Sequence, residues 1–249
     1  MQINPDKTEA KIIGSKHQLK KFNAVSSLLF SGTTVSFVDN IKIVGVTLDS
    51  SLSFDKHVSL ICQACNFHMR ALRHIRPLLS FDFANQLACS IVASRIDYCN
   101  SLFYGMSKHN IDKLQRLQNN LARIVCCAPA RASAAPLLKR LHWLPIEQRI
   151  EYKIACMSFN VLHSHIPNYL NDLIVPYVPP RNLRSSTSNL LSVPNSSHLS
   201  AAANRSFSFA APIVWSSLSA NTRSATSIDN FKRCLKTELF ISAFNVNLR

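Results

Sequence analysis

The feature that most constrains the fold is a change of hydrophobic period at Ser53. Before it, the apolar residues come in short bursts rich in β-branched side chains: AKIIG, FNAVSSLLF, TTVSFV and IKIVGVTLD. Such bursts, separated by the turn-forming pairs Ser31-Gly32 and Asp39-Asn40, predict a small antiparallel sheet. We expect residues 33–38 and 41–49 to pair as a tight hairpin.

After Ser53 the apolar period becomes about 3.6 residues, which predicts a long succession of helices. Three of them are expected to follow Ser53, Ser80 and Ser107, whose hydroxyls can accept from the free amides of a first helical turn. Further helices are expected over 137–142, 146–163, 167–173, 207–218 and 228–240. The sequence therefore predicts the α+β class: a small N-terminal antiparallel sheet followed by a mostly helical chain.

The charge of the chain is uneven along its length. The 249 residues carry a formal net charge of +15, of which residues 1–56 contribute +2 and residues 57–249 contribute +13. An excess of this size favours an anionic partner, either nucleic acid or an anionic membrane surface. The alternative is a set of solvated basic helix faces without a partner.

Two of the expected helices carry basic faces. On the first, Arg70, Arg73 and Arg76 lie in the final turns, where favourable interaction of cations with a helix C-terminus is an alternative explanation. On the third expected helix, the apolar residues form a stripe along one side. Another side carries Lys113, Arg116, Asn120 and Arg123. Favourable interaction with a helix C-terminus explains Lys113 and Arg116 less well than it explains Arg73 and Arg76, because Lys113 and Arg116 lie in the middle of their helix.

Cysteine and histidine invite a search for metal or nucleophile chemistry. The eight cysteines form no compact framework and no signal peptide precedes them, so we expect reduced thiols and an intracellular protein, cytoplasmic or nuclear. Cys62, Cys65 and His68 have the spacing of metal ligands but fall inside a helical stripe without a second ligand pair, which favours core cysteines over zinc. No phosphate-binding glycine loop, adjacent aspartate pair or uninterrupted apolar membrane span is visible. From the residues alone, no catalytic centre can be assigned.

Five segments occur in an order that is similar to one known family. They are NPDKTE (4–9), VGVTLDSSLSFDKHV (44–58), LHWLPIEQRIEYKI (141–154), RSFSFAAPIVWSSL (205–218) and FKRCLKTELF (231–240). Together they resemble the C-terminal part of LINE-type (non-LTR) retrotransposon reverse transcriptases of the jockey-like and chicken-repeat-like groups. Two residues depart from the family pattern, namely Ser216, where Asn is usual, and Ser219, where Pro is usual.

The resemblance implies a division of the chain. Residues 1–52 would be the remaining edge of a polymerase palm, with motif D over residues 3–9 and the primer grip over residues 41–49. Residues 53–128 would form a helical thumb and 129–175 a helical C-terminal extension. Composition and periodicity predict that residues 176–204 are a connector rich in Ser and Pro with at most one short strand, and that residues 205–249 contain C-terminal helices. In the family the catalytic aspartates precede the segment similar to INPDKTE, so we expect Met1 to be an interior start and residues 1–249 not to polymerise DNA alone.

The resemblance also assigns roles to single residues. Lys7 matches the motif D lysine, a general acid for the leaving pyrophosphate in an intact polymerase; an ordinary exposed lysine is the alternative. Val44, Gly45 and Val46 match the tip of the primer grip, where a glycine allows close approach of a strand; an edge hairpin that needs a small residue is the alternative. Thumb helices in the family lie along the template–primer duplex. The resemblance therefore predicts that five cations contact phosphates: Arg70, Arg73, Lys113, Arg116 and Arg123.

The expected function is non-specific binding of RNA or an RNA–DNA duplex, as part of an RNA-directed DNA polymerase. No cofactor is expected for these residues, since Mg²⁺ would be bound by the aspartates of an intact polymerase. The alternative from another class is a non-catalytic helical interaction module or an inert product of a truncated element. A third reading, an active polymerase, predicts Mg²⁺-dependent primer extension that needs Lys7.

Overall fold

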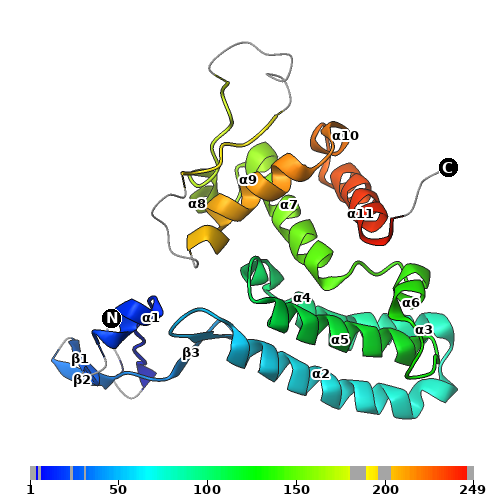
Figure 1. Cartoon of the computed structure of the whole chain (residues 1–249), viewed down its shortest axis with the longest axis horizontal. Coiled ribbons are helices and arrows are strands. Elements are labelled where there is room, and N and C mark those ends of the chain that lie inside the picture. The colour runs from blue at the N-terminus through cyan, green and yellow to red at the C-terminus, as the bar shows by residue number, and fades with distance from the viewer. Residues whose placement is uncertain are drawn as a thin grey trace.

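The chain folds as two small sheets followed by two groups of helices (Figure 1). The computed structural model describes residues 4, 7–22, 25–30, 32–179, 189–195 and 203–245. The sheets lie at the N-terminal end, and the helices that follow make up most of the molecule. The predicted α+β class is confirmed.

Among its described residues, the N-terminal region contains four strands in two separate hairpins. Its elements are α1 (Lys16–Lys20), β1 (Ser27–Phe30), β2 (Thr33–Ser36), β3 (Asn40–Ile43) and β4 (Val46–Asp49). Strand β1 pairs with β2 and β3 pairs with β4, both antiparallel. The predicted pairing of residues 33–38 with 41–49 is wrong. Gly32 and the pair Val44-Gly45 have positive φ angles, and turns of this kind join neighbouring strands directly, so each hairpin closes locally.

The residues before β1 are less sheet-like than their apolar content indicates. Of the burst at 10–14, only Ala10 forms a bridge, to Phe37. Helix α1, which the sequence did not predict, begins after a capping box in which Ser15 and Gln18 exchange hydrogen bonds.

The first group of helices corresponds to the predicted thumb. It contains α2 (Asp55–Ile75), α3 (Phe81–Leu87), a π-helical segment η3 (Ala88–Ala93), α4 (Ser94–Asp97) and α5 (Lys108–Val125), with short 3₁₀ turns η2 (Arg76–Leu78) and η4 (Asn100–Phe103). Of the three predicted caps, Ser80 is confirmed, since its hydroxyl accepts from the Phe83 N–H at 3.3 Å. Ser107 occupies the N-cap position of α5 without a side-chain cap hydrogen bond. Ser53 is not the N-cap of α2, because Phe54 occupies that position with a left-handed φ of 63°. The Ser53 hydroxyl nevertheless accepts from the first-turn N–H of Asp55 at 3.2 Å, as predicted.

The second group contains the C-terminal helices. They are α6 (Ala134–Arg140), α7 (Ile146–Ser164), α8 (Asn168–Asn171), the 3₁₀ turn η5 (Ala203–Arg205), α9 (Phe207–Ser217), α10 (Ala220–Arg223) and α11 (Ile228–Phe244). The helices predicted over 137–142, 146–163, 167–173, 207–218 and 228–240 are confirmed, with shifted ends for α6 and α8 and a longer C-terminal end for α11. In the predicted connector, Pro176 bridges Leu191. Residues 180–188 and 196–202 of it lie outside the described residues.

One apolar core joins both groups of helices. It extends from Val46 and α2 through α5 and α7 to Leu239 on α11. In the C-terminal part, Phe231 stacks on Phe159 and Trp215, with ring centroids 4.5 and 5.7 Å apart. Strand β4 reaches this core through Val46, so the β3–β4 hairpin is fixed to the helices.

Candidate nucleic-acid interface

Helices α2 and α5 pack side by side and run in the same direction (Figure 1). Near their starts, Asn110 Nδ2 donates to Asp55 Oδ1 at 2.7 Å and to the Ser53 carbonyl at 3.2 Å. Near their ends, Arg76 Nε donates to the Val125 carbonyl at 2.9 Å. The parallel pair therefore presents one continuous seam, along which the predicted phosphate contacts from the two helices can be compared.

Lys113 and Arg116 lie beside Cys62 on this seam. Burial raises the pKa of the Cys62 thiol, and the positive charges of Lys113 and Arg116 on α5 oppose that increase. Lys113 is half-buried, whereas Arg116 is exposed and its Nε donates to the Asp112 carbonyl at 3.2 Å. The structure thus brings these two predicted cations together near the first half of α2.

Arg73 and Arg123 line a pocket of about 380 Å³ at the other end of the pair. Arg76 and Asn120 line it as well. The guanidinium of Arg123 is partly engaged, because its Nε donates to the Ala132 carbonyl at 3.0 Å and its Nη1 to Asn120 Oδ1 at 2.9 Å. Arg73 is exposed and has no such bond among the described residues. It is therefore the most available cation of this pocket.

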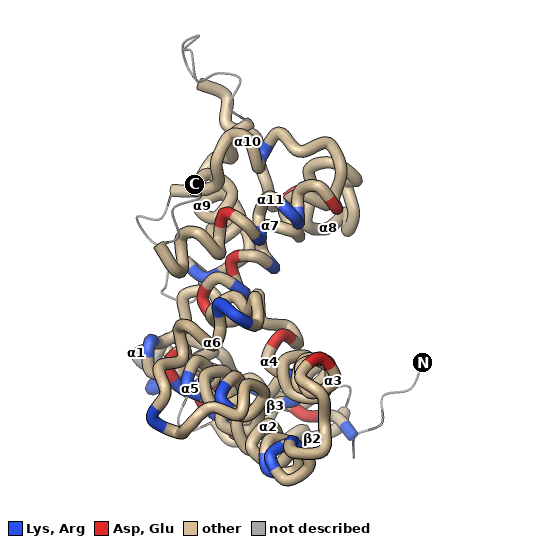
Figure 2. Tube along the Cα trace, turned by 90° about the vertical axis from the view of Figure 1, so that its right-hand side faces the viewer, with Lys and Arg blue, Asp and Glu red and all other residues tan. Residues whose placement is uncertain are grey.

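Arg70 belongs to neither pair. It is exposed on α2 one turn before Arg73 and does not line the pocket. Arg76 also lines the pocket but was not among the predicted phosphate contacts. Its position three residues after Arg73 could have indicated it. Across the described residues the five predicted cations form no ion pair with a carboxylate. Lys and Arg recur along the traces of α2 and α5 in Figure 2.

The hairpin tip lies away from this pocket, against α4. Val44 and Gly45 are the two turn residues, with φ angles of 45° and 80°. The Tyr98 hydroxyl donates to the Val44 carbonyl at 2.7 Å, and a Cβ added to Gly45 would lie 3.4 Å from the Tyr98 ring. Val44 is 79% exposed, whereas Val46 is 4% exposed in the core. Of the three predicted residues, Val44 and Gly45 form the tip and Val46 anchors it.

Lys7 is exposed near the N-terminal end of the described chain. Its backbone N–H donates to the Asn4 carbonyl at 3.2 Å. The contacts found for it among the described residues do not reach α2 or α5.

On α2, Cys65 belongs to the Cys and His residues whose spacing resembles that of metal ligands. This thiol is fully buried, its Sγ lies 3.8 Å from the Val92 carbonyl, and burial raises its pKa to about 12. It is a core residue that packs α2 against η3. In the described ranges, no group of three or more His, Cys, Asp or Glu side chains is arranged to hold a metal ion.

A search of known proteins adds no relative to these observations. No family model, curated protein or solved structure matches the chain. Over the part of the chain that the structure describes, none of the helices combines the length and the apolar character that crossing a membrane requires.

Proposed function

We propose that this chain is the template–primer-binding part of a reverse transcriptase of the non-LTR retrotransposon type, and that it binds RNA or an RNA–DNA duplex along the α2–α5 seam. The observation that carries the proposal is the placement of Lys113 with Arg116, and of Arg73 with Arg123, along one pair of parallel helices. The five ordered segments that resemble this family support the same proposal.

The dimensions and charges of the seam suit a nucleic-acid backbone. Ten residues separate Lys113 from Arg123, which is about 15 Å along a helix and matches roughly four nucleotides of one strand. The cations form no ion pair with an acid of the described chain, so they can neutralise phosphates. Contacts of this kind give affinity without reading sequence, with dissociation constants of roughly 10⁻⁴–10⁻⁶ M at physiological salt.

The test is the salt dependence of binding, measured by fluorescence anisotropy with a labelled RNA–DNA duplex. We expect binding to weaken steeply between low and moderate salt. The double variant Lys113→Gln/Arg116→Gln should bind more weakly, and its slope of log K against log salt should be smaller by about 2, because each lost phosphate contact removes about 0.9. A matched control is Lys232→Gln/Arg233→Gln, which removes two exposed cations from α11.

The outcomes separate the proposal from its alternatives. Equal losses in the test and control variants would mean that net charge alone governs binding. An affinity that changes neither with salt concentration nor with the charge reversals Arg116→Glu and Arg123→Glu would favour a helical interaction module instead. Because Arg123 also holds the Ala132 carbonyl, its reversal counts only if circular dichroism shows an unchanged helical fold.

Polymerase activity needs its own assay. On the present proposal residues 1–249 bind a primed RNA template without extending the primer, with or without Mg²⁺. Mg²⁺-dependent extension that disappears in Lys7→Ala would instead establish an active polymerase.

A further inference from the structure

A second hollow lies on another side of α2, under the β3–β4 hairpin. It has a volume of about 590 Å³, is open to solvent, and is lined by residues of the hairpin and α2 and by residues 94, 95 and 98 in and just after α4. Leu60, Ile61 and Ala64 supply apolar surface, and Lys42, Arg95 and Tyr98 are among its polar lining residues. A cavity of this size with an apolar wall and a few polar groups is typical of small-molecule sites.

His57, which lines this pocket, has a ring nitrogen without a hydrogen-bond partner among the described residues. The side chain lines the pocket and is only 5% exposed. Its Nδ1 accepts from the Thr47 N–H at 3.3 Å, so in the neutral ring the proton is on Nε2. Nε2 is buried and has no partner among the described residues. A buried donor without an acceptor costs about 1–3 kcal/mol, so an acceptor that entered the pocket and reached it would relieve that cost.

The charges around the pocket are all positive. Lys42 and Arg95 are exposed and form no ion pair among the described residues, and none of the lining residues is Asp or Glu. Arg95 is close enough to α2 that its charge counteracts the raised pKa of Cys65. Two cations and a neutral donor favour an anionic group in the ligand.

This pocket is separate from the α2–α5 seam. On a helix with 3.6 residues per turn, His57, Leu60, Ile61 and Ala64 share one side of α2. Cys62 and Arg73, which mark the seam, are rotated from them by nearly half a turn. The pocket and the proposed phosphate-binding seam can therefore be tested independently.

We propose that the pocket binds a small organic anion. Its anionic group lies between Lys42, Arg95 and the Nε2–H of His57, and its apolar body packs on Leu60 and Ala64. The ligand is a free small molecule that bears a carboxylate, phosphate or sulfonate group, because the apolar wall and the anion-binding groups line the same hollow.

The experiment uses anilinonaphthalene sulfonate, a fluorescent aromatic anion, as the probe. We expect saturable binding of one probe per chain. Arg95→Gln should weaken it about five- to tenfold, as expected for loss of a charged hydrogen bond. Ala64→Phe should weaken binding by placing a ring on the apolar wall where the body of the probe packs. Arg70→Gln, which removes an exposed arginine from another side of α2, should leave binding within about twofold of wild type.

Two further measurements make the result decisive. The proton or nitrogen resonance of His57 Nε2 should shift on addition of the probe, and this readout still decides the question if Ala64→Phe does not fold. Leu29→Ser removes an apolar side chain that is 72% exposed on β1 and should not change the affinity. The proposal is wrong if Leu29→Ser weakens binding, if Arg95→Gln does not, or if the His57 resonance stays fixed.

A last arm distinguishes a small molecule from nucleic acid. If the RNA–DNA duplex displaces the probe and Arg95→Gln weakens duplex binding equally, the pocket is part of the nucleic-acid surface and the small-molecule proposal fails. If the duplex and the probe bind together, the two sites are independent, whatever the outcome of the salt test on the seam.

Discussion

Asp49 connects the β3–β4 hairpin to helix α2 through its carboxylate. Oδ1 accepts from the Ser51 N–H, the Ser51 hydroxyl and the Ser53 N–H at 3.0, 2.8 and 2.9 Å. Oδ2 accepts from the Ser53 hydroxyl at 3.1 Å and the Phe54 N–H at 2.8 Å. Burial alone would raise the pKa of Asp49, but these hydrogen bonds outweigh it and hold the pKa below its usual range. The charged form is therefore the one that the fold stabilises.

We expect Asp49→Ala to lower the free energy of unfolding by about 1.5–3 kcal/mol, the usual range for hydrogen bonds to a charged group. Urea denaturation followed by circular dichroism measures the change. Asp39→Ala is the matched control, because Asp39 is exposed and its side chain has no hydrogen bond among the described residues. A loss as large in the control as in Asp49→Ala would contradict the role assigned to this carboxylate.

His57 makes the stability depend on pH in a predictable direction. Burial, and secondarily the charge of Lys42, lower the pKa of His57 below its usual value. Between the folded pKa and the unfolded value of about 6.5, the unfolded chain binds a proton that the folded chain does not. Stability contributed by neutral His57 is therefore fully present above pH 6.5 and decreases as the pH falls toward the folded pKa.

The measurement is the melting temperature as a function of pH between 7 and 5. Wild type should lose more stability over this interval than His57→Gln, in which the titrating group is absent. The control His74→Gln, at an exposed position near the end of α2, should keep the wild-type slope. Parallel slopes for wild type and His57→Gln would refute the assignment.

At the scale of single elements, Ser80 and Ser107 form a natural comparison. Both occupy an N-cap position, but only the Ser80 hydroxyl accepts from a first-turn amide, that of Phe83. We expect Ser80→Ala to lower the free energy of unfolding by about 1 kcal/mol and Ser107→Ala to change it far less. Chemical denaturation of both variants provides the comparison. Equal effects would mean that the cap hydrogen bond does not stabilise α3.

The helices could be predicted from the sequence because apolar residues that recur every 3.6 positions lie on one face of a helix, and that face is buried. Strand pairing was predicted wrongly, because the hairpins close at Gly32 and at Val44-Gly45, whereas Asp39-Asn40, the other turn-forming pair, closes none. The cap of α2 was misassigned for a different reason. The carboxylate of Asp49 accepts from the Ser53 and Phe54 amides, and Phe54 adopts a left-handed φ, so the helix begins one residue later than predicted, at Asp55.

The residues of the α2–α5 seam could be predicted only within each helix, and not between the two helices. Spacing along α5 placed Lys113, Arg116 and Arg123 near one another, but the parallel alignment with α2 depends on contacts between residues more than forty positions apart, such as Arg76 with Val125. The pocket beside His57 had no signal in the sequence. Whether a histidine nitrogen lacks a partner depends on which side chains the fold brings around it.

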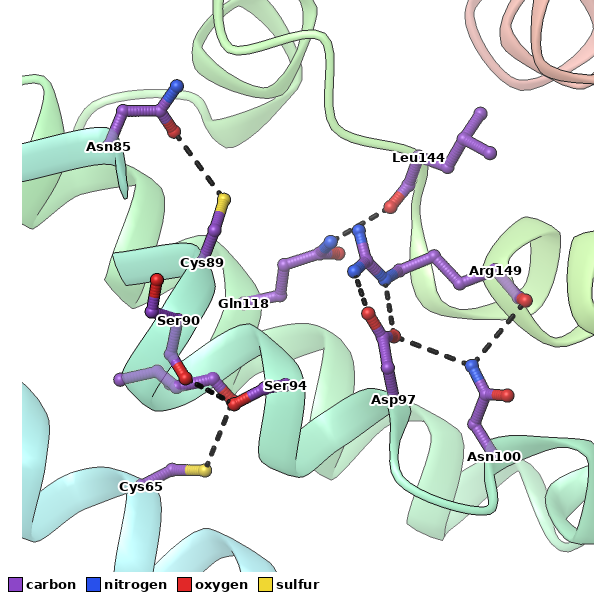
Figure 3. A network of polar contacts seen from close by, with 11 residues as sticks. Cys65, Asn85, Cys89, Ser90, Ser94, Asp97, Asn100, Gln118, Leu144 and Arg149 are labelled. Atoms are coloured by element: carbon purple, nitrogen blue, oxygen red, sulfur yellow. Dashed lines mark hydrogen bonds and ion pairs between the residues drawn. The ribbon is translucent and has the colours of Figure 1, made fainter. Parts of the chain in front are cut away.

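At the scale of the whole molecule, an ion pair joins the two groups of helices. Arg149 on α7 donates from Nε to Asp97 Oδ1 on α4 at 2.8 Å, and its Nη2 pairs with Oδ2 (Figure 3). Asn100 Nδ2 adds contacts of 3.4 Å to Asp97 Oδ1 and 3.5 Å to the Arg149 carbonyl. This cluster links α4 in the first group of helices to α7 in the second across 52 positions of sequence.

The contribution of that link is measurable in a double-mutant cycle with Asp97→Asn and Arg149→Met. We expect a coupling energy of about 1 kcal/mol in urea denaturation, below that of a fully buried pair, because 36% of the Asp97 side chain and 21% of the Arg149 side chain remain exposed. The control cycle replaces Arg149→Met by Lys153→Met, an exposed cation one turn further along α7 that forms no ion pair among the described residues. That cycle should give a coupling near zero. If both cycles gave the same coupling, the two groups of helices would be held together by their shared apolar core alone, and the ion pair would be incidental to the fold.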